Sequence, residues 1–126
     1  MILDKKIKEK TARVGVVGLG YVGLPLAIEF VKSGYKVVGI DIDNNKVDSI
    51  NNGMNYIKDV NDEILKSAVN DNSLYATSDF SSVKNLDTIS ICVPTPLKKQ
   101  KNPDISFIVS VMDKINVYLH DDMVLI

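Results

Sequence analysis

The residues with the clearest chemical meaning are three glycines, Gly18, Gly20 and Gly23, in the arrangement G-x-G-x-x-G. A β-branched run of strand length precedes them, and an apolar run of helix length follows them. In that setting the first glycine permits a tight turn, the second lets a pyrophosphate approach the backbone, and the third lets the helix pack closely on the strand. The N–H groups of Tyr21 and Val22, at the helix start, would bind phosphate. The pattern predicts a dinucleotide-binding loop, with a glycine-rich turn that binds no ligand as the alternative.

A carboxylate stands where such a site binds the adenosine ribose. Asp41 ends the second predicted strand, about 20 residues beyond the glycines, and would accept hydrogen bonds from the ribose hydroxyls. Asp41 and Asp43 would both repel a 2′-phosphate, so the predicted cofactor is NAD rather than NADP. Two simpler interpretations stay open here: Asp41 as a plain helix cap, and Lys46 as a solvent-exposed helix lysine instead of a ligand of the ribose or a phosphate.

Alternating strands and helices must position these side chains. The strands are apolar on both faces, which is typical of a parallel sheet covered on both sides, and right-handed crossovers then give a doubly wound α/β sheet, a Rossmann fold. About five strands are expected, with the sheet truncated after the fifth. The predicted strands span 13–18, 36–41, 74–77, 88–93 and 123–126, and the predicted helices span 22–33, a segment capped by Asn44 and ended by Gly53, a segment from Asn61, and 104–119.

Composition limits the class of protein. The chain has 126 residues, 15 basic and 16 acidic, for a net charge of -1, which argues against nucleic-acid binding. Its longest uncharged run is too short and too rich in glycine and proline to span a membrane. A single cysteine cannot form an internal disulfide, so the expected compartment is the cytoplasm. We expect an amphipathic lead-in at 1–12 and one cofactor-binding domain at 13–126, with no second domain after it.

Four stretches together resemble a known family. They are VVGLGYVGLPLA at 16–27, GIDID at 39–43, ICVPTP at 91–96 and PDIS at 103–106. Their order and spacing are similar to those of the UDP-glucose/GDP-mannose dehydrogenase family, the nucleotide-sugar 6-dehydrogenases, over roughly residues 13 to 126. The Tyr-Val pair inside the glycine motif and the Val-Pro-Thr-Pro loop are more specific than the glycines alone.

One further segment resembles a branch of that family. Asn51-Asn52-Gly53 followed by Tyr56-Ile57 is typical of the UDP-N-acetylglucosamine and UDP-N-acetylmannosamine dehydrogenases. The next residue is a departure, because the family commonly has an acidic residue where this chain has Lys58. No role for the segment 54–60 follows from the sequence.

The resemblance implies an activity and a set of site residues. Family members oxidise C6 of a nucleotide sugar from alcohol to acid in two NAD-dependent steps, through a thiohemiacetal on a cysteine, as homo-oligomers that supply polysaccharide biosynthesis. It implies NAD as the cofactor, a UDP-sugar as the substrate, and no catalytic side chain or metal ligand in this chain, since the catalytic residues and most sugar contacts belong to a part of the enzyme that follows. The implied cofactor-binding residues are Gly18, Gly20, Tyr21, Val22, Gly23, Asp41, Lys46, Pro94 and Thr95, the last two in the loop beside the nicotinamide.

Cys92 is not the family's nucleophile on this interpretation. It closes an apolar strand, where a thiol is normally buried and unreactive. Two other classes stay open at this point: the cofactor domain of a 6-phosphogluconate or 3-hydroxyacid dehydrogenase, which the Val-Pro-Thr-Pro loop argues against, and a stand-alone NAD-sensing module, which should end in its own capped sheet.

Overall fold

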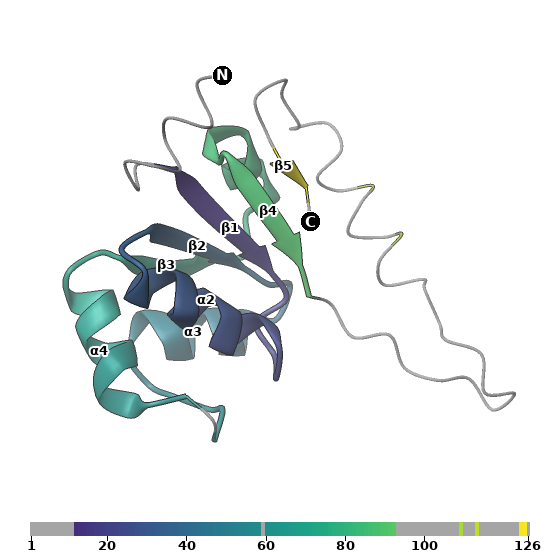
Figure 1. Cartoon of the computed structure of the whole chain (residues 1–126). Coiled ribbons are helices and arrows are strands. Elements are labelled where there is room, and N and C mark those ends of the chain that lie inside the picture. Colours follow the sequence, from purple (N-terminus) through teal and green to yellow (C-terminus); the bar gives the residue numbers. More distant parts are fainter. Residues whose placement is uncertain (1–11, 59, 93–108, 110–112, 114–123, 126) are drawn as a thin grey trace, which may run out of the picture.

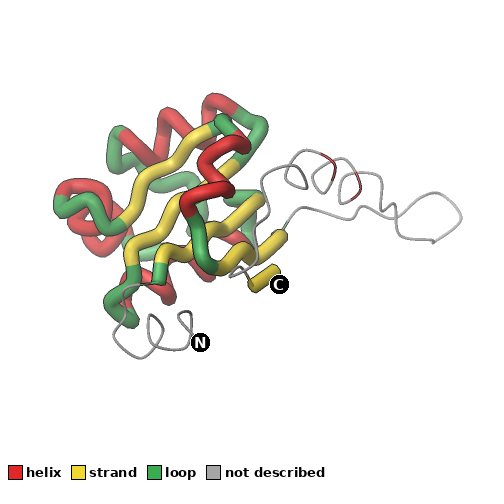
Figure 2. Tube along the Cα trace, turned by 90° about the horizontal axis from the view of Figure 1, so that it is seen from above, coloured by secondary structure: helices red, strands yellow, loops and turns green. Residues whose placement is uncertain are grey.

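Among the described residues, five short strands form one parallel sheet. The computed structural model describes residues 12–58, 60–92, 109, 113 and 124–125. Within these, the sheet order is β3-β2-β1-β4-β5, and every neighbouring pair is parallel (Figure 1). The strands are β1 (Arg13–Val17), β2 (Lys36–Ile40), β3 (Leu74–Thr77), β4 (Thr88–Ile91) and β5 (Val124–Leu125). The predicted doubly wound sheet of five strands is confirmed, and Figure 2 shows the strands side by side as one layer.

Helices cover this sheet on one face and a short 3-10 helix covers the other. The helices α2 (Gly23–Lys32), α3 (Asn44–Asn51) and α4 (Asp62–Asn70) lie together on the first face (Figure 1). Their apolar residues, among them Leu24, Ile50 and Leu65, share one buried cluster. The 3-10 helix η1 (Phe80–Asn85) contributes Val83 to a separate cluster with Val17, Ile40, Leu86 and Ile89. The chain therefore reverses its winding between β1 and β4, the place where doubly wound sheets bind ligands.

The predicted helix starts are right for one helix and wrong by a residue for another. Asn61 caps α4, because its side chain accepts hydrogen bonds from the N–H groups of Glu63 and Ile64. Helix α3 is capped by Asp43, not by Asn44 as the sequence predicted. Asp43 keeps an extended backbone and accepts from the N–H of Asn45, whereas Asn44 is already helical.

Other boundaries differ by one to three residues, and one element was not predicted. Strand β1 ends at Val17 because Gly18 turns the chain at a φ of 93°. Cys92 lies after β4 and not inside it, although its N–H still donates to the carbonyl of Val17 at 2.7 Å. Helix η1 lacks the apolar periodicity that predicts a helix, and Asp79 caps it by accepting from the N–H of Ser81.

Some predicted features fall outside the described residues. These are the lead-in at 1–12 except for Ala12, which is buried, and the loop that contains Pro94 and Thr95. The helix predicted at 104–119 is described only at Val109 and Asp113, and both are helical.

Two side chains form hydrogen bonds with backbone groups of the strands. The amide of Asn51, in α3, donates to the carbonyl and accepts from the N–H of Ala76, each at 2.8 Å, and so pairs the outer edge of β3. The buried carboxylate of Asp87 accepts from the N–H of Arg13 at 2.8 Å and ties the start of β1 to the start of β4. No helix within the described part of the chain has the length and hydropathy that crossing a membrane requires.

Candidate functional site

The turn between β1 and α2 requires glycine at its first and last positions. Gly18 has a φ of 93°, in the left-handed region that side chains disfavour, and its N–H donates to the carbonyl of Ile40 at 2.8 Å. A Cβ on Gly23 would lie 1.5 Å from the carbonyl oxygen of Gly18. The two roles expected from the sequence, a tight turn and a close approach of helix to strand, are therefore both visible.

The middle glycine, Gly20, differs from Gly23 because the space around it is open. A Cβ on Gly20 would find no atom within 4 Å, so no protein contact demands glycine there. The side chains of Tyr21 and Val22 are 83% and 67% exposed and leave the start of α2 uncovered. Helix α2 has no side-chain N-cap and no acidic residue in its first turn. The N–H groups of Leu24 and Leu26 donate to the carbonyls of Gly20 and Val22. The N–H groups of Tyr21 and Val22, at the helix start beside Gly20, are therefore the ones suited to an anion.

Asp41 joins the end of β2 to this loop. One oxygen of its half-buried carboxylate accepts from the N–H of Leu19 at 2.8 Å, and the other accepts from the N–H of Asp43 at 2.9 Å. A carboxylate offers about four lone-pair positions, so these two bonds leave acceptor capacity for hydroxyl donors. Asp41 is therefore not the helix cap that the sequence left open, because Asp43 has that role. Lys46 lies half-buried in the first turn of α3.

Pro94 and Thr95, expected beside the nicotinamide, lie outside the described residues. The described residue nearest to them in the chain is Cys92, whose Cβ lies 3.4 Å from the position that a Cβ on Gly23 would take. Its thiol is half-buried, and burial raises the pKa of Cys92 above its ordinary value. The thiol is therefore neutral at pH 7, as the sequence predicted, although it adjoins the glycine loop and does not lie within a strand.

The sequence missed the part that Tyr56 plays in the site. Its hydroxyl donates to the carbonyl of Leu19 at 2.5 Å, so the segment after α3 reaches the glycine loop. Burial, and then the nearby carboxylates of Asp41 and Asp43, raise the pKa of Tyr56 well above its ordinary range. No local signal points to this contact, because the two residues that form it are far apart in the chain.

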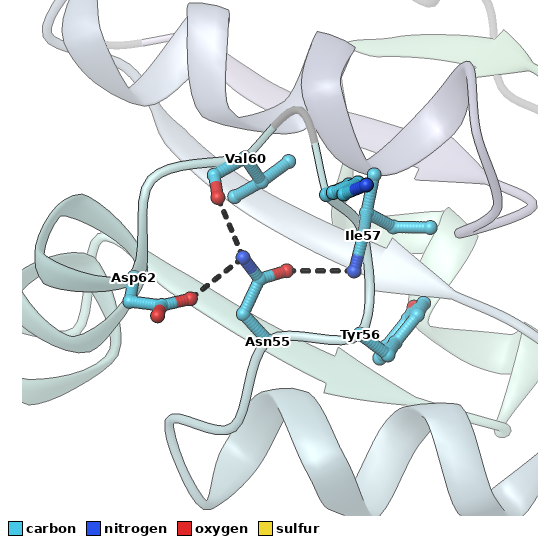
Figure 3. A pocket seen from close by; sticks show the side chains of 6 residues that line it. Asn55, Tyr56, Ile57, Val60 and Asp62 are labelled. Carbon is cyan, nitrogen blue, oxygen red and sulfur yellow. Dashed lines mark hydrogen bonds between the residues drawn. The ribbon is translucent and has the colours of Figure 1, made fainter.

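The segment around Tyr56 is held by one asparagine. The amide nitrogen of Asn55 donates to the carbonyl of Val60 at 2.6 Å and to the carboxylate of Asp62 at 2.8 Å, and its oxygen accepts from the N–H of Ile57 at 2.8 Å (Figure 3). These residues and Lys58 line an open pocket of about 450 Å³. Among the described residues, no three metal-ligating side chains lie close enough together to hold a metal ion.

Residues 12–126 match the model of the UDP-glucose/GDP-mannose dehydrogenase family, NAD binding domain. The chain belongs to this family. Its cofactor is NAD, as the carboxylates of Asp41 and Asp43 predicted.

Relatives within the family agree with this assignment. UDP-N-acetyl-D-mannosamine dehydrogenase of Methanococcus aeolicus is 35% identical over 100% of this chain and 29% of its own length. The structure of UDP-D-ManNAc dehydrogenase from Pyrococcus horikoshii superposes with a TM-score of 0.83 at 34% identity, over 90% of this chain and 27% of that one. GDP-mannose dehydrogenase from Pseudomonas aeruginosa, solved as a ternary complex, gives 0.80 at 33% identity, over 84% and 25%. The chain spans 11% of the length of one curated relative, from Methanocaldococcus jannaschii, and 29% of that of the relative from Methanococcus aeolicus.

Proposed function

We propose that the chain is the NAD-binding part of a longer nucleotide-sugar 6-dehydrogenase, which oxidises the C6 alcohol of a UDP-hexose to the uronic acid in two NAD-dependent steps. The family match supports the reaction class. The names of several relatives, which are UDP-N-acetyl-D-mannosamine and UDP-N-acetyl-D-glucosamine dehydrogenases, favour a UDP-N-acetylhexosamine as the substrate. GDP-mannose dehydrogenases among the relatives make GDP-mannose the substrate to test against it.

The cofactor pyrophosphate would lie over Gly20, bound by the N–H groups of Tyr21 and Val22. The observation that carries this proposal is the open space at Gly20, beside the uncapped start of α2. Elsewhere in the same turn a side chain is excluded by the protein itself, since Gly23 has backbone atoms against it. At Gly20 a side chain would instead take up the space of a ligand.

The remaining contacts of the cofactor follow from the ends of the strands. Asp41 would accept hydrogen bonds from the adenosine ribose, with Lys46 beside it, and its charge would disfavour the 2′-phosphate of NADP. Pro94 and Thr95 would meet the nicotinamide from the loop after β4, on the grounds of the family resemblance. Bound NAD supplies a hydride acceptor to the reaction.

The other parts of the reaction would come from the rest of the longer protein. We propose that residues 13–126 form one cofactor domain, with 1–12 as a lead-in, and that the sugar and the catalytic side chains are held elsewhere. The whole enzyme would be a cytoplasmic homo-oligomer that supplies polysaccharide biosynthesis. The short span of the chain relative to its relatives supports this division.

Two measurements test the proposal. Calorimetric titration of the 126-residue chain should give binding of NAD and weaker binding of NADP, and equal affinities would contradict the role of Asp41. Incubation of the chain with NAD and UDP-N-acetylhexosamines should produce no NADH. The longer gene product should produce two NADH per sugar, because alcohol is oxidised to acid, whereas one NADH per sugar would refute the two-step reaction.

A further inference from the structure

Leu19, the residue between the first two glycines, is held through its whole backbone by side chains from other segments. Asp41 accepts from its N–H at 2.8 Å, and Tyr56 donates to its carbonyl at 2.5 Å. Its own side chain is fully buried and takes the space beside Gly39, where a Cβ would lie 2.8 Å from a methyl carbon of Leu19. Leu19 is therefore fixed in both position and rotation.

Fixing the carbonyl of Leu19 also fixes the N–H of the next residue. The two groups belong to one planar trans peptide, in which C=O and N–H point in opposite directions. The N–H of Gly20 is thus directed away from the Tyr56 hydroxyl, and Gly20 is the glycine with open space around its Cβ position.

We propose that Tyr56 is a positioning residue for the cofactor, whose hydroxyl holds the Leu19 carbonyl so that the Gly20 N–H points at the pyrophosphate. The proposal rests on the placement of the pyrophosphate over Gly20 given under the proposed function. It assigns a role to the segment 54–60, for which the sequence offered none.

Tyr56 is itself well placed for this role before any ligand binds. The three hydrogen bonds of Asn55 close the loop on both sides of Tyr56, and the tyrosine side chain lies on the far side of Asn55 from Asp62 (Figure 3). Ile57 and Val60 anchor the same loop in the core at 6% exposure each. A donor that is ordered in the free protein loses no further freedom on binding, and this favours affinity.

The hydrogen bond from the Tyr56 hydroxyl to the Leu19 carbonyl stays intact across neutral pH. The backbone carbonyl only accepts, so the phenol must be protonated to donate. Burial and the neighbouring carboxylates raise the pKa of Tyr56, which keeps the proton on the hydroxyl. The bond therefore does not switch with pH in the range where NAD binding is measured.

The test compares Tyr56→Phe with the parent chain. This variant keeps the ring and its packing and removes only the hydroxyl. Tyr75→Phe, at a half-exposed position on β3, is the matched control. Three ligands are titrated by calorimetry: NAD, ADP-ribose, which retains the pyrophosphate, and adenosine, which lacks it.

We expect Tyr56→Phe to raise the Kd for NAD and for ADP-ribose by about three- to tenfold, the effect of one lost hydrogen bond. The Kd for adenosine, and every Kd of Tyr75→Phe, should equal that of the parent. If Tyr56 had a packing role only, Tyr56→Phe would lower the melting temperature, and the Kd values for the pyrophosphate ligands would change no differently from the Kd for adenosine.

A second measurement uses the unmodified chain and does not depend on how well the variant folds. In the ¹H–¹⁵N spectrum of the parent chain, the amide resonance of Gly20 should shift on addition of ADP-ribose and not on addition of adenosine. If ADP-ribose binds and the amide resonance of Gly20 does not shift, the proposal is overturned.

The outcomes separate this inference from the proposed function. If the parent binds NAD and Tyr56→Phe binds it equally well, Tyr56 has no positioning role and the cofactor site stands. Equal weakening of adenosine and ADP-ribose would also refute it, since the effect would not come from the pyrophosphate. A parent chain that fails to bind NAD overturns the proposed function and this inference with it.

Discussion

The glycine loop offers a direct test, because two of its glycines are required for different reasons. Alanine at Gly23 would bring its Cβ within 1.5 Å of the carbonyl oxygen of Gly18 and 2.7 Å of the carbonyl carbon. Both are backbone atoms, so no rotamer change relieves the clash, and α2 must move away from β1. Alanine at Gly20 would meet nothing within 4 Å. The same substitution, three residues apart, therefore has opposite expected consequences for stability.

The magnitudes follow from these distances. A contact of 1.5 Å must lengthen by about 1.5 Å to reach the shortest separation that real Cβ atoms show. Overpacking of this kind costs typically 1–3 kcal/mol, and a backbone clash belongs at the upper end, so we expect Gly23→Ala to lose about 3 kcal/mol. The melting temperature should then fall by roughly 10–15 °C for a chain of this size. Gly20→Ala should stay within about 0.5 kcal/mol of the parent.

NAD binding provides a second test of the glycine loop. Gly20→Val should melt close to the parent chain and yet lose detectable affinity for NAD, because the branched side chain would fill the space proposed for the pyrophosphate. Differential scanning calorimetry and NAD titration of the variants Gly20→Ala, Gly20→Val and Gly23→Ala measure both effects. If Gly23→Ala melts with the parent, the close contact of α2 with Gly18 is wrong. If Gly20→Val binds NAD normally, the pyrophosphate does not lie over Gly20.

Three further predictions concern side chains around the loop. Asp41→Ala should weaken NAD binding by about 1–3 kcal/mol, the scale of a lost charged hydrogen bond, and an unchanged Kd in calorimetry would contradict the role of this carboxylate. Burial raises the pKa values of Tyr56 and Cys92, so these groups ionise more readily in the unfolded chain than in the folded one. Their contribution to the free energy of unfolding should be fully present below about pH 9 and should decrease as the pH rises. Urea unfolding of Tyr56→Phe above pH 10 should show a smaller loss than the parent, and an identical pH dependence would refute the assignment to Tyr56. Asn51→Ala should lower the stability by about 1–3 kcal/mol in urea unfolding, because Ala76 loses both of its side-chain hydrogen bonds; a change below 0.5 kcal/mol would mean that water replaces them.

The sequence alone predicted the strands, the helix α4 and the glycine turn, but not the 3-10 helix η1. Hydrophobic runs of strand and helix length are local properties, and so is a capping side chain such as Asn61, which reaches N–H groups only two and three residues ahead. Gly18 and Gly23 could be assigned because the turn between a strand and a helix leaves few conformations. The family resemblance came from short motifs whose spacing is read directly from the chain.

Tertiary structure alone decided what holds the loop in place. Tyr56 and Leu19 are 37 residues apart, and only the packing of the segment after α3 brings the hydroxyl to the carbonyl. Leu19 and Asp41 are 22 residues apart and meet because β1 and β2 are neighbours in the sheet. The structure also decided which residue caps α3, for which the sequence offered Asn44 and, as an alternative, Asp41. Asp41 accepts from the N–H of Leu19, and Asp43 caps the helix. Contacts of this kind depend on where distant segments meet, and local spacing carries no signal of that meeting.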